Sequence, residues 1–335
     1  MKVLIASLID VEAIDRLEKE HEVIRAFHNV SEENLRTLIS DCDALVFRSG
    51  VKVDADLMAC APRLRLLVRA GSGLDNLDVT YAQQRKVELV RIPQPSARAV
   101  AEMAFSFMLA LSRHLLDADR SMRQGRWEKH ALTGYLLQGK TLGVVGLGNT
   151  GSCVAEMGVA WGMQVIGCVQ HPSPERTAMF SEKGIRLVDF NEVVADADYL
   201  SIHVPLKENT RKLMDEATLG RMKPGAYLLN LARGGIVDEQ ALYVSLTNGG
   251  GLRGAALDVH EREGTGMLSP LAELDNVILT PHIGAMAIDA QREIGRKVLE
   301  VIGFFAANDG CGGLPERVAG VTVGYASSQK GGIRD

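Results

Sequence analysis

Short apolar runs rich in β-branched residues alternate along the chain with longer stretches whose apolar positions recur at helical spacing. The early part of the chain contains such runs at Lys2–Ala6, Ala44–Phe47, Leu64–Arg69 and Glu88–Arg91, with a helical stretch at Val11–Lys19. Runs of four to six residues with an apolar centre predict buried strands, and their alternation with helical stretches is typical of parallel sheets with crossover helices.

A longer helical pattern separates this part from the next. It begins near Ala97, after Pro93 and Pro95, and continues toward Met122. The strand rhythm then restarts with predicted strands at Thr141–Val145, Val165–Cys168, Tyr199–His203, Tyr227–Asn230, Gly254–Leu257 and Val277–Leu279. We therefore expect an α/β protein with two Rossmann-like, doubly wound parallel-sheet domains and a cleft between them.

Composition agrees with this organisation. A chain of 335 residues exceeds the usual size of a single core, so two domains are expected. A net charge of −5 gives no reason to expect nucleic acid as a partner. No uninterrupted apolar stretch reaches the roughly 18 residues of a membrane helix, and acidic residues end the first apolar run. These features predict a cytoplasmic protein without a membrane partner.

The five cysteines are odd in number and follow no metal-ligand or CxxC spacing, which predicts buried thiols in a reducing compartment. The histidines His130, His171, His203 and His260 also lack metal-ligand spacing. We therefore expect no metal site.

A glycine-rich loop, Gly146-Leu147-Gly148-Asn149-Thr150-Gly151, follows the predicted strand at 141–145 and precedes a predicted helix at 152–161. Gly146 would permit the tight turn, Gly148 would let the backbone approach a pyrophosphate, and Gly151 would let helix and sheet pack closely. The N–H groups of Asn149 and Thr150 would face the anion. This context predicts a dinucleotide site, although a methyltransferase could use such a loop for S-adenosylmethionine.

One expected part of a dinucleotide site is missing. The next strand should end in an acidic residue that binds the adenosine ribose, and residues 167–172 contain none. Gln170 could bind a ribose hydroxyl, His171 and Arg176 could meet a 2′-phosphate, and Glu175 is the nearest carboxylate. We therefore expect NAD as the cofactor, with NADP as the alternative.

Three stretches, 230–235, 258–263 and 280–284, place an arginine, a carboxylate and a histidine after this loop. Arg233 could hold a substrate carboxylate through its planar fork of donors. His282 could donate or accept a proton. Glu263 would orient His282 if it contacts the other ring nitrogen, unless Arg262 pairs with Glu263 instead. A methyltransferase would leave this trio unexplained.

The sequences around these residues resemble the D-isomer-specific 2-hydroxyacid dehydrogenase family, and in particular its D-3-phosphoglycerate dehydrogenase-like members. The resemblance runs from about Ala44 to beyond His282. It is carried by the stretches 44–49, 69–76, 146–151, 203–206 and 222–225 and by the three stretches above. By this resemblance Arg233, Glu263 and His282 are the catalytic residues.

The resemblance implies an NAD(P)-dependent oxidoreductase. It would transfer a hydride between nicotinamide and the carbinol or carbonyl carbon of a small 2-hydroxy or 2-oxo acid, including acids with a phosphate or phosphonate group. Further cofactor contacts would come from His203, Pro205, Thr210, Ala232, Asp258 and Gly284. Asp258 would accept a hydrogen bond from the carboxamide, with a helix or turn cap as its alternative role.

The resemblance also implies a discontinuous arrangement. Residues 1–98 and 286–335 would form the substrate-binding domain, with a flexible tail from about 308, and residues 99–285 would form the dinucleotide-binding domain. A homodimer is implied as well, with Met103–Gln138 as its interface. The alternative function is that of a nucleotide-sensing interaction protein of the corepressor type, which has the same fold.

Two features of the first domain predict an anionic small-molecule substrate. The small residues after the strand at 64–69 would leave backbone N–H groups open, so Ser72 and Gly73 could receive the substrate carboxylate, unless this is an ordinary tight turn. Arg48 and Arg69, with Arg98 as a further candidate, could bind a distal phosphate. Alternatively, these arginines could pair with Asp54, Asp75 or Asp78.

Overall fold

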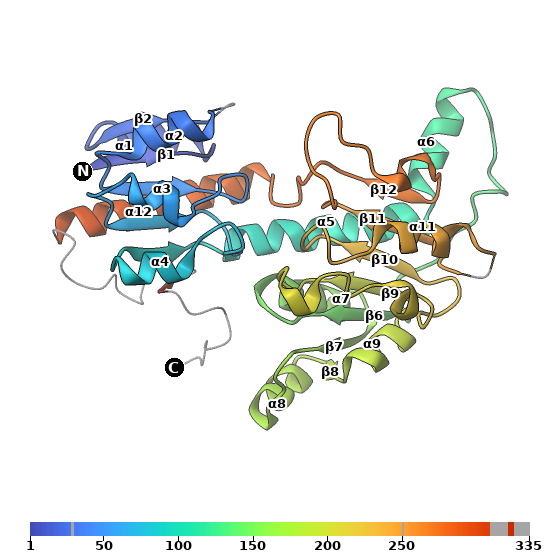
Figure 1. The fold of residues 1–335 in the computed structure, drawn as a ribbon. Coiled ribbons are helices and arrows are strands. Elements are labelled where there is room, and N and C mark those ends of the chain that lie inside the picture. The colour runs from blue at the N-terminus through green and yellow to red at the C-terminus, as the bar shows by residue number, and fades with distance from the viewer. Residues whose placement is uncertain (28–29, 250, 309–320, 325–335) are drawn as a thin grey trace. The chain divides into compact units, whose positions relative to one another are not determined.

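The computed structural model describes residues 1–27, 30–249, 251–308 and 321–324. It forms two compact units (Figure 1). The first unit comprises Met1–Ala97 and Ala285–Asp335, and the second comprises Arg98–Gly284. The return of the chain to the first unit after residue 284 makes that unit discontinuous.

The first unit contains a six-stranded sheet. Its strands are β1 (Lys2–Ile5), β2 (Glu22–Arg25), β3 (Ala44–Phe47), β4 (Leu66–Arg69), β5 (Glu88–Arg91) and β13 (Thr322–Val323). The spatial order is β13-β5-β4-β3-β1-β2, and all neighbours are parallel except the antiparallel pair of β13 and β5. The five parallel strands therefore have the flavodoxin-like order, whose switch point lies between β1 and β3.

Helices cover both faces of this sheet: α1 (Val11–Leu17), α2 (Glu32–Ile39), α3 (Ala55–Ala59), α4 (Val79–Gln84) and α12 (Ile288–Ala307). Strand residues alternate between the two faces because successive side chains point to opposite sides. Val3 and Ile5 belong to the core shared with α1 and α12, whereas Leu4 belongs to the core shared with α2, α3 and α4. In Figure 1 the red helix α12 lies beside the blue elements of this unit, although these elements are far from α12 in sequence.

The second unit contains a seven-stranded parallel sheet. Its strands are β6 (Thr141–Val145), β7 (Gln164–Cys168), β8 (Ile185–Leu187), β9 (Tyr199–Ile202), β10 (Tyr227–Asn230), β11 (Gly254–Leu257) and β12 (Val277–Leu279). The order β12-β11-β10-β9-β6-β7-β8 is that of a Rossmann sheet with one additional strand. Its switch point lies between β6 and β9, where ligands of such sheets bind.

Two hydrophobic clusters cover the faces of this sheet. One involves α5 (Gln94–Ser112), α7 (Asn149–Ala160) and α8 (Pro174–Glu182). The other involves α9 (Phe190–Asp196), α10 (Glu216–Leu219) and α11 (Glu239–Thr247). Two short 3-10 helices, η1 (Glu208–Thr210) and η2 (Pro270–Glu273), lie in the loops. Both predicted doubly wound sheets are therefore present.

The single helix predicted from Ala97 toward Met122 is wrong. α5 begins at Gln94 and ends at Ser112, and α6 (Leu115–Arg123) follows at an angle of 61°. His114 has a φ of 51°, a left-handed conformation that interrupts the helix. Within the described residues, no single helix is long and apolar enough to cross a membrane, and only this bent pair meets that test jointly. Much of the apolar surface of α5 lies in the core of the second unit.

Other differences from the sequence predictions have simple causes. The strands β2, β8 and β13 were not predicted, because they are only two to four residues long and have few fully buried positions. Cys42 and Cys168 are buried, and burial raises the pKa of each thiol to about 11. Cys60 is exposed, contrary to expectation, because it caps the end of α3. The predicted flexible tail and Cys311 lie largely or wholly outside the described residues.

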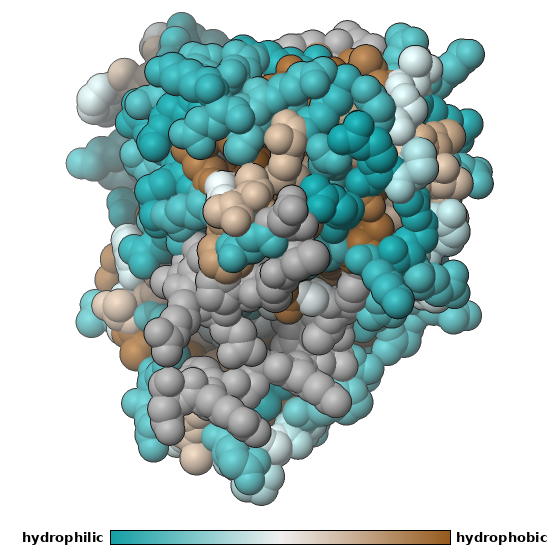
Figure 2. Space-filling view, turned by 90° about the vertical axis from the view of Figure 1, so that its left-hand side faces the viewer, coloured by the Kyte–Doolittle hydropathy of each residue, from teal (hydrophilic) through white to brown (hydrophobic). Residues whose placement is uncertain are grey.

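One face of the molecule is mainly polar. On the face shown in Figure 2, hydrophilic side chains predominate and hydrophobic ones appear as separate patches beside the grey atoms. This agrees with the location of most large apolar side chains in the four buried clusters.

Packing of α12 on α1 gives a stability test. A Cβ on Gly295 would lie 2.7 Å from the Ala13 Cβ and 2.8 Å from the Asp10 Cβ, whereas one on Gly303 of the same helix would meet nothing within 4 Å. We expect Gly295→Ala to lower the free energy of unfolding by about 1–2 kcal/mol, because the helices must separate. Gly303→Ala should raise it by about 0.5–1 kcal/mol through helix propensity. Urea unfolding of both variants measures these changes, and equal effects would contradict the packing argument.

Candidate active site

Three neighbouring strands position the predicted catalytic residues. β10, β11 and β12 are adjacent and parallel, so their carboxyl ends lie at one edge of the sheet. Arg233 follows β10, Glu263 follows β11 and His282 follows β12. The topology therefore places the three residues in adjacent loops, although Arg233 and His282 are 49 residues apart in sequence.

His282 and Glu263 form a hydrogen-bonded pair. The Nδ1 of His282 lies 2.9 Å from Oε2 of Glu263. A carboxylate only accepts, so Nδ1 donates, and Nε2 remains available for a proton transfer. The pair is partly accessible, with 32% of the His282 side chain and 41% of the Glu263 side chain exposed.

The charge on Glu263 is maintained by its neighbours. Burial raises the pKa of this carboxyl group. The hydrogen bond and charge of His282, together with the backbone N–H of His260, lower it by a larger amount, so the pKa of Glu263 is below its ordinary value. The N–H of His260 lies 3.3 Å from Oε1. Glu263 therefore contacts His282, and the pairing with Arg262 that the sequence left open is not required to explain its position.

The backbone of His282 is strained and is held by Asp258. His282 has a φ of 56°, which is uncommon for a residue with a side chain. Asp258 is buried, and it accepts hydrogen bonds from Thr280 Oγ1 (2.6 Å), Ile283 N (2.8 Å) and Gly284 N (2.7 Å). Both oxygens thus hold the turn around His282, which is the capping role considered for this residue.

A second turn holds Arg233. The side chain of Asn230 accepts from Ala232 N (3.1 Å) and donates to the carbonyl of Arg233 (3.0 Å). The guanidinium Nη1 of Arg233 donates to the Ala232 carbonyl at 2.7 Å. A Cβ on Gly234 would lie 1.7 Å from the carbonyl oxygen of His260, so only glycine fits there. The Arg233 turn therefore contacts the loop that leads to Glu263.

The glycine-rich loop leaves β6 at the switch point. Gly146 has a φ of 95°, and its Cβ would lie 2.8 Å from the carbonyl oxygen of His203. A Cβ on Gly151 would lie 1.9 Å from the carbonyl oxygen of Gly146. Gly146 is therefore required by its left-handed backbone, and Gly151 is required because α7 packs closely on the loop.

The start of α7 fits an anionic ligand. Gly148 is its N-cap and provides no side-chain cap, whereas the side chains of Ser173, Asp189 and Asp238 cap the starts of α8, α9 and α11. The first N–H groups, including those of Asn149 and Thr150, therefore have no side-chain cap from the described residues. A Cβ on Gly148 would meet nothing within 4 Å. The residues present fit the pyrophosphate of a dinucleotide.

The residues predicted on the adenosine side follow β7. Gln170 and His171 lie in the segment that joins β7 to α8, and Glu175 lies in the first turn of α8. The backbone N–H at the helix start, and then the hydroxyl of Ser173, lower the pKa of the Glu175 carboxyl group. Glu175 is therefore a charged group at a helix start near the end of β7, and Arg176 lies beside it in the same turn.

The segment after β9 borders the glycine-rich loop. The Nε2 of His203 lies 2.7 Å from Ser201 Oγ, and its buried Nδ1 has no hydrogen-bond partner among the described residues. Burial lowers the pKa of His203 to about 3. Thr210 Oγ1 donates to the carbonyl of Pro205 at 2.6 Å and accepts from Lys207 N at 2.7 Å. The hydroxyl of Thr210 thus shapes this turn.

In the first unit, Arg48 lies at the switch point of the sheet. Its backbone N–H donates to the hydroxyl of Ser7, which follows β1 (3.0 Å), and its side-chain Nη1 donates to Gln291 Oε1 of α12 (2.6 Å). Burial lowers the pKa of its guanidinium group. The side-chain amide of Asn76 donates to the carbonyl of Arg48 (2.9 Å) and also to that of Val51, which links the loops after β3 and β4.

Arg69 turns back over its own loop. Its Nε donates to the carbonyl of Gly73 at 2.8 Å, and its guanidinium lies 5.8 Å from the centre of the Phe47 ring. A Cβ on Gly71 would lie 2.8 Å from Nη1. Arg69 is buried and thus shapes the loop that contains Ser72, which is exposed, and Gly73. Asp54 and Asp78 instead cap α3 and α4, and Arg98 of the second unit pairs with Glu102 at 3.0 Å.

Sequence reasoning missed several residues that position the site. Asn76 and Glu239 form hydrogen bonds with loops that are distant in sequence, and Asn230 bonds to the turn after its own strand. Only Asn230 is recognisable in the sequence, because it is a polar residue at the end of an apolar strand. No group of three or more potential ligand side chains gathers for a metal ion in the described part of the chain.

A family of known proteins and several relatives match this chain. Residues 105–284, more than half of the chain, match the family described as D-isomer specific 2-hydroxyacid dehydrogenase, NAD binding domain. The chain is 38% identical to a hydroxypyruvate reductase of Thermotoga maritima over 88% of this chain and 94% of the relative. It is 40% identical to a D-3-phosphoglycerate dehydrogenase of Archaeoglobus fulgidus over 95% of this chain but only 59% of that relative.

Solved structures give the same result. The TT0316 protein of Thermus thermophilus has a TM-score of 0.81 and 31% identity, with 90% of this chain and 95% of that chain covered. An acyclic imino acid reductase in complex with NADPH and D-Arg has a TM-score of 0.80 and 28% identity, covering 92% and 98%. D-lactate dehydrogenase of Aquifex aeolicus, complexed with NAD and lactic acid, has a TM-score of 0.80 and 25% identity, covering 92% and 96%.

Fold, site and comparisons together define an NAD-dependent oxidoreductase that acts on the CH–OH group of 2-hydroxyacids. The chain belongs to the D-isomer-specific 2-hydroxyacid dehydrogenase family. The named relatives that identify this activity give no support to the corepressor-type alternative.

The partly buried His203, whose Nδ1 is inaccessible to solvent, gives a pH test of stability. Its pKa is about 3 in the folded chain but near 6.5 when unfolded, so between these values the unfolded chain binds more protons. The free energy of unfolding therefore falls as the pH drops below 6.5, and His203→Gln lacks this loss. We expect the stability of the wild type relative to His203→Gln to decrease from pH 7.5 to pH 5 in urea unfolding. A difference that is constant with pH would contradict a neutral His203 in the folded chain.

Proposed function

We propose that Arg233, His282 and Glu263 carry out proton transfer and substrate binding in hydride exchange between NAD and a small 2-hydroxy or 2-oxo acid. The observation that carries the proposal is the 2.9 Å pair of His282 Nδ1 and Glu263 Oε2 on a turn held by Asp258. A hydrogen-bonded carboxylate that orients an imidazole is the arrangement expected of a general acid or base.

Each residue has a separate task in this proposal. His282 Nε2 gives a proton to the oxygen of a 2-oxo acid during reduction and takes it from the hydroxyl during oxidation. Glu263 fixes the ring and stabilises its protonated form by its charge. Arg233 binds the substrate carboxylate with two parallel N–H donors. When bound, the nicotinamide supplies or accepts the hydride.

The second unit holds the dinucleotide in our proposal. Gly146, Gly148, Asn149, Thr150 and Gly151 receive the pyrophosphate, supported by the absence of a side-chain cap at the start of α7 among the described residues. Gln170, His171 and Glu175 meet the adenosine ribose. The nicotinamide side would contact the remaining predicted residues, which are His203, Pro205, Thr210, Ala232, Asp258 and Gly284. NAD is favoured and NADP is accepted, since no acidic residue ends β7 and one structural relative was solved with NADPH.

The first unit, residues 1–98 and 286–335 in our assignment, supplies substrate contacts. Ser72 and Gly73 receive the carboxylate through backbone N–H groups, while Arg48 and Arg69 favour a substrate with a distal anionic group such as a phosphate or phosphonate. The location of Arg48 at the switch point supports this role, because ligands of open α/β sheets bind there. Its partly buried guanidinium would gain an anionic partner.

We also propose that the protein is a cytoplasmic homodimer with residues 103–138 at the interface. Five large apolar side chains in this segment are at least half exposed: Leu115, Leu116, Met122, Trp127 and Leu136. Contact with a second copy would remove them from water. Sedimentation velocity of the purified chain distinguishes a dimer from a monomer.

The catalytic assignment has a direct test. We expect His282→Asn to lower kcat by about 10²–10⁴-fold, the range for loss of a general acid or base, while the affinity for NAD is retained. Arg233→Ala should raise KM as well as lower kcat. Cofactor absorbance is followed with NAD or NADP against a set of 2-hydroxy and 2-oxo acids. The His21→Asn variant, which lies outside every proposed site, is the matched control, and full activity of His282→Asn would refute the mechanism.

Arg48 predicts substrate preference. We expect Arg48→Ala to lower kcat/KM for acids with a phosphate or phosphonate by about 10–100-fold, as for loss of a charged hydrogen bond, with little change for unsubstituted acids. Arg63→Ala is the control, because this exposed side chain pairs with Asp43. The ratio of kcat/KM for paired substrates is measured. Equal losses for both substrate types would remove Arg48 from anion recognition.

A further inference from the structure

A buried carboxylate outside the catalytic trio holds the loop that carries Glu263. Glu239 is the first residue of α11, and it is only 4% exposed. Its Oε1 accepts from the backbone N–H of Glu261 at 2.7 Å, and its Oε2 accepts from the hydroxyl of Ser269. One side chain therefore binds both ends of the segment 261–269.

The contact at the first end is reciprocal. The backbone N–H of Glu239 donates to Oε1 of Glu261 at 3.2 Å, while the N–H of Glu261 donates to Glu239. At the other end, Ser269 Oγ also accepts a hydrogen bond from the N–H of Leu271 at 3.2 Å. Ser269 thereby caps the start of η2. Three of these four bonds are donated by a backbone N–H, so the ends of the segment cannot shift without breaking a partly buried hydrogen bond.

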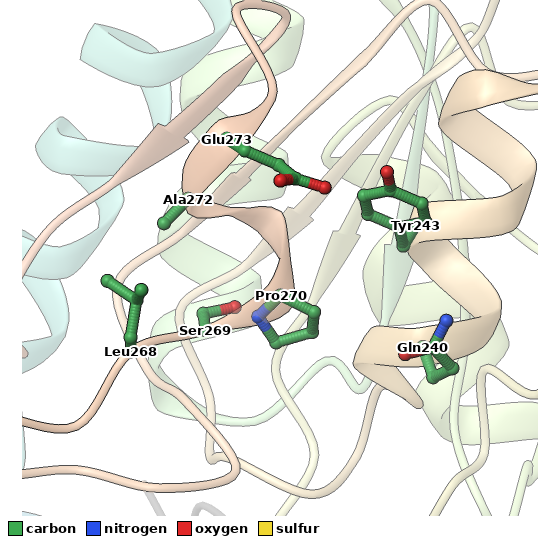
Figure 3. A pocket seen from close by; sticks show the side chains of 7 residues that line it. All are labelled: Gln240, Tyr243, Leu268, Ser269, Pro270, Ala272 and Glu273. Atoms are coloured by element: carbon green, nitrogen blue, oxygen red, sulfur yellow. The ribbon is translucent and has the colours of Figure 1, made fainter.

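The middle of the segment offers few other restraints. Gly264 and Gly266 have φ values of 133° and 81°, and the side chains of Met267 and Leu268 are 54% and 82% exposed. A hollow of about 470 Å³ lies between this segment and α11. Figure 3 shows Leu268, Ser269 and Pro270 on one side of it, and Gln240 and Tyr243 of α11 on the other. The segment thus depends on its ends for a defined path.

Glu239 also connects the two catalytic loops. It lies six residues after Arg233, at the point where the Arg233 turn enters α11. The same turn contacts the backbone of His260 through Gly234, next to the residue whose N–H Glu239 holds. Displacement of Glu261 would move Glu263, whose carboxylate forms the 2.9 Å bond with His282.

We propose that Glu239 is a positioning residue for the reaction, which acts by holding Glu263 against His282. This rests on the proposed roles of Glu263 and His282. Its contribution is geometric, since a misplacement of about 1 Å at a catalytic group can cost roughly 100-fold in rate. Because it acts through Glu263, the effect of losing it depends on whether Glu263 is functional.

A double-mutant cycle tests this dependence. We expect Glu239→Ala to lower kcat by about 10–100-fold in the wild-type background and by less than about 3-fold in the Glu263→Gln background. The KM for NAD should be unchanged in both. The pH profile of kcat/KM for Glu239→Ala should approach that of Glu263→Gln, because both lose the same oriented carboxylate.

Two further variants separate positioning from folding. Glu239→Gln retains an acceptor for Glu261 N and a polar group for Ser269, so it should keep kcat within about 3-fold of wild type. Glu273→Ala is the control, because this carboxylate lines the hollow with Ser269 and points toward Tyr243 of α11 (Figure 3). We expect it to leave kcat unchanged.

The outcomes are distinct. Equal losses from Glu239→Ala in both backgrounds, or an unchanged pH profile, would overturn the positioning role and leave only a structural one. A Glu263→Gln variant with wild-type kinetics would instead overturn the proposed function of Glu263, whatever Glu239 does. Failure of Glu239→Gln to restore kcat would contradict the hydrogen-bond account.

Discussion

The site depends on one buried carboxylate and the turn that it caps. Asp258 accepts hydrogen bonds from Thr280, Ile283 and Gly284 and so encloses His282, whose left-handed backbone is unfavourable by itself. The three bonds overcome this strain and fix the direction of the imidazole. The position of the ring relative to Glu263, and hence the pair proposed to move the proton, follows from the cap.

The topology of the two sheets explains how short loops can position the residues of the site. In the second unit, parallel strands bring the ends of β10, β11 and β12 to one edge, while the glycine-rich loop leaves the same sheet at the switch point between β6 and β9. The first unit has a different strand order, yet Arg48 again lies at its switch point, between the ends of β1 and β3. Rigid strands therefore determine where the chemical groups can lie, and loop contacts determine how they point.

Much of this was predictable from the sequence, because the buried strands have apolar residues at their centre and a glycine that tolerates no Cβ is recognisable from its motif. The strands at 44–47, 88–91 and 141–145 were predicted without error. The break at His114 was not, since a left-handed φ leaves no hydrophobic pattern. β2 was missed because its outer residues are charged and exposed. The capping contacts of Asp258 and Glu239 join positions about 20 to 30 residues apart, and no local pattern reports such pairs.

Asp258 and Glu239 share a property that bears on how the site is built. Within the described residues, the contacts shown for both carboxylates are with backbone N–H groups and hydroxyl groups rather than with lysine or arginine. A flexible cationic side chain could follow a moving carboxylate, whereas a backbone N–H has a fixed direction, so these bonds specify the path of the chain. They also add no positive charge that would compete with Arg233 for an anionic substrate. The geometry of the site can therefore be rigid while its cationic character is left to the groups that bind substrate.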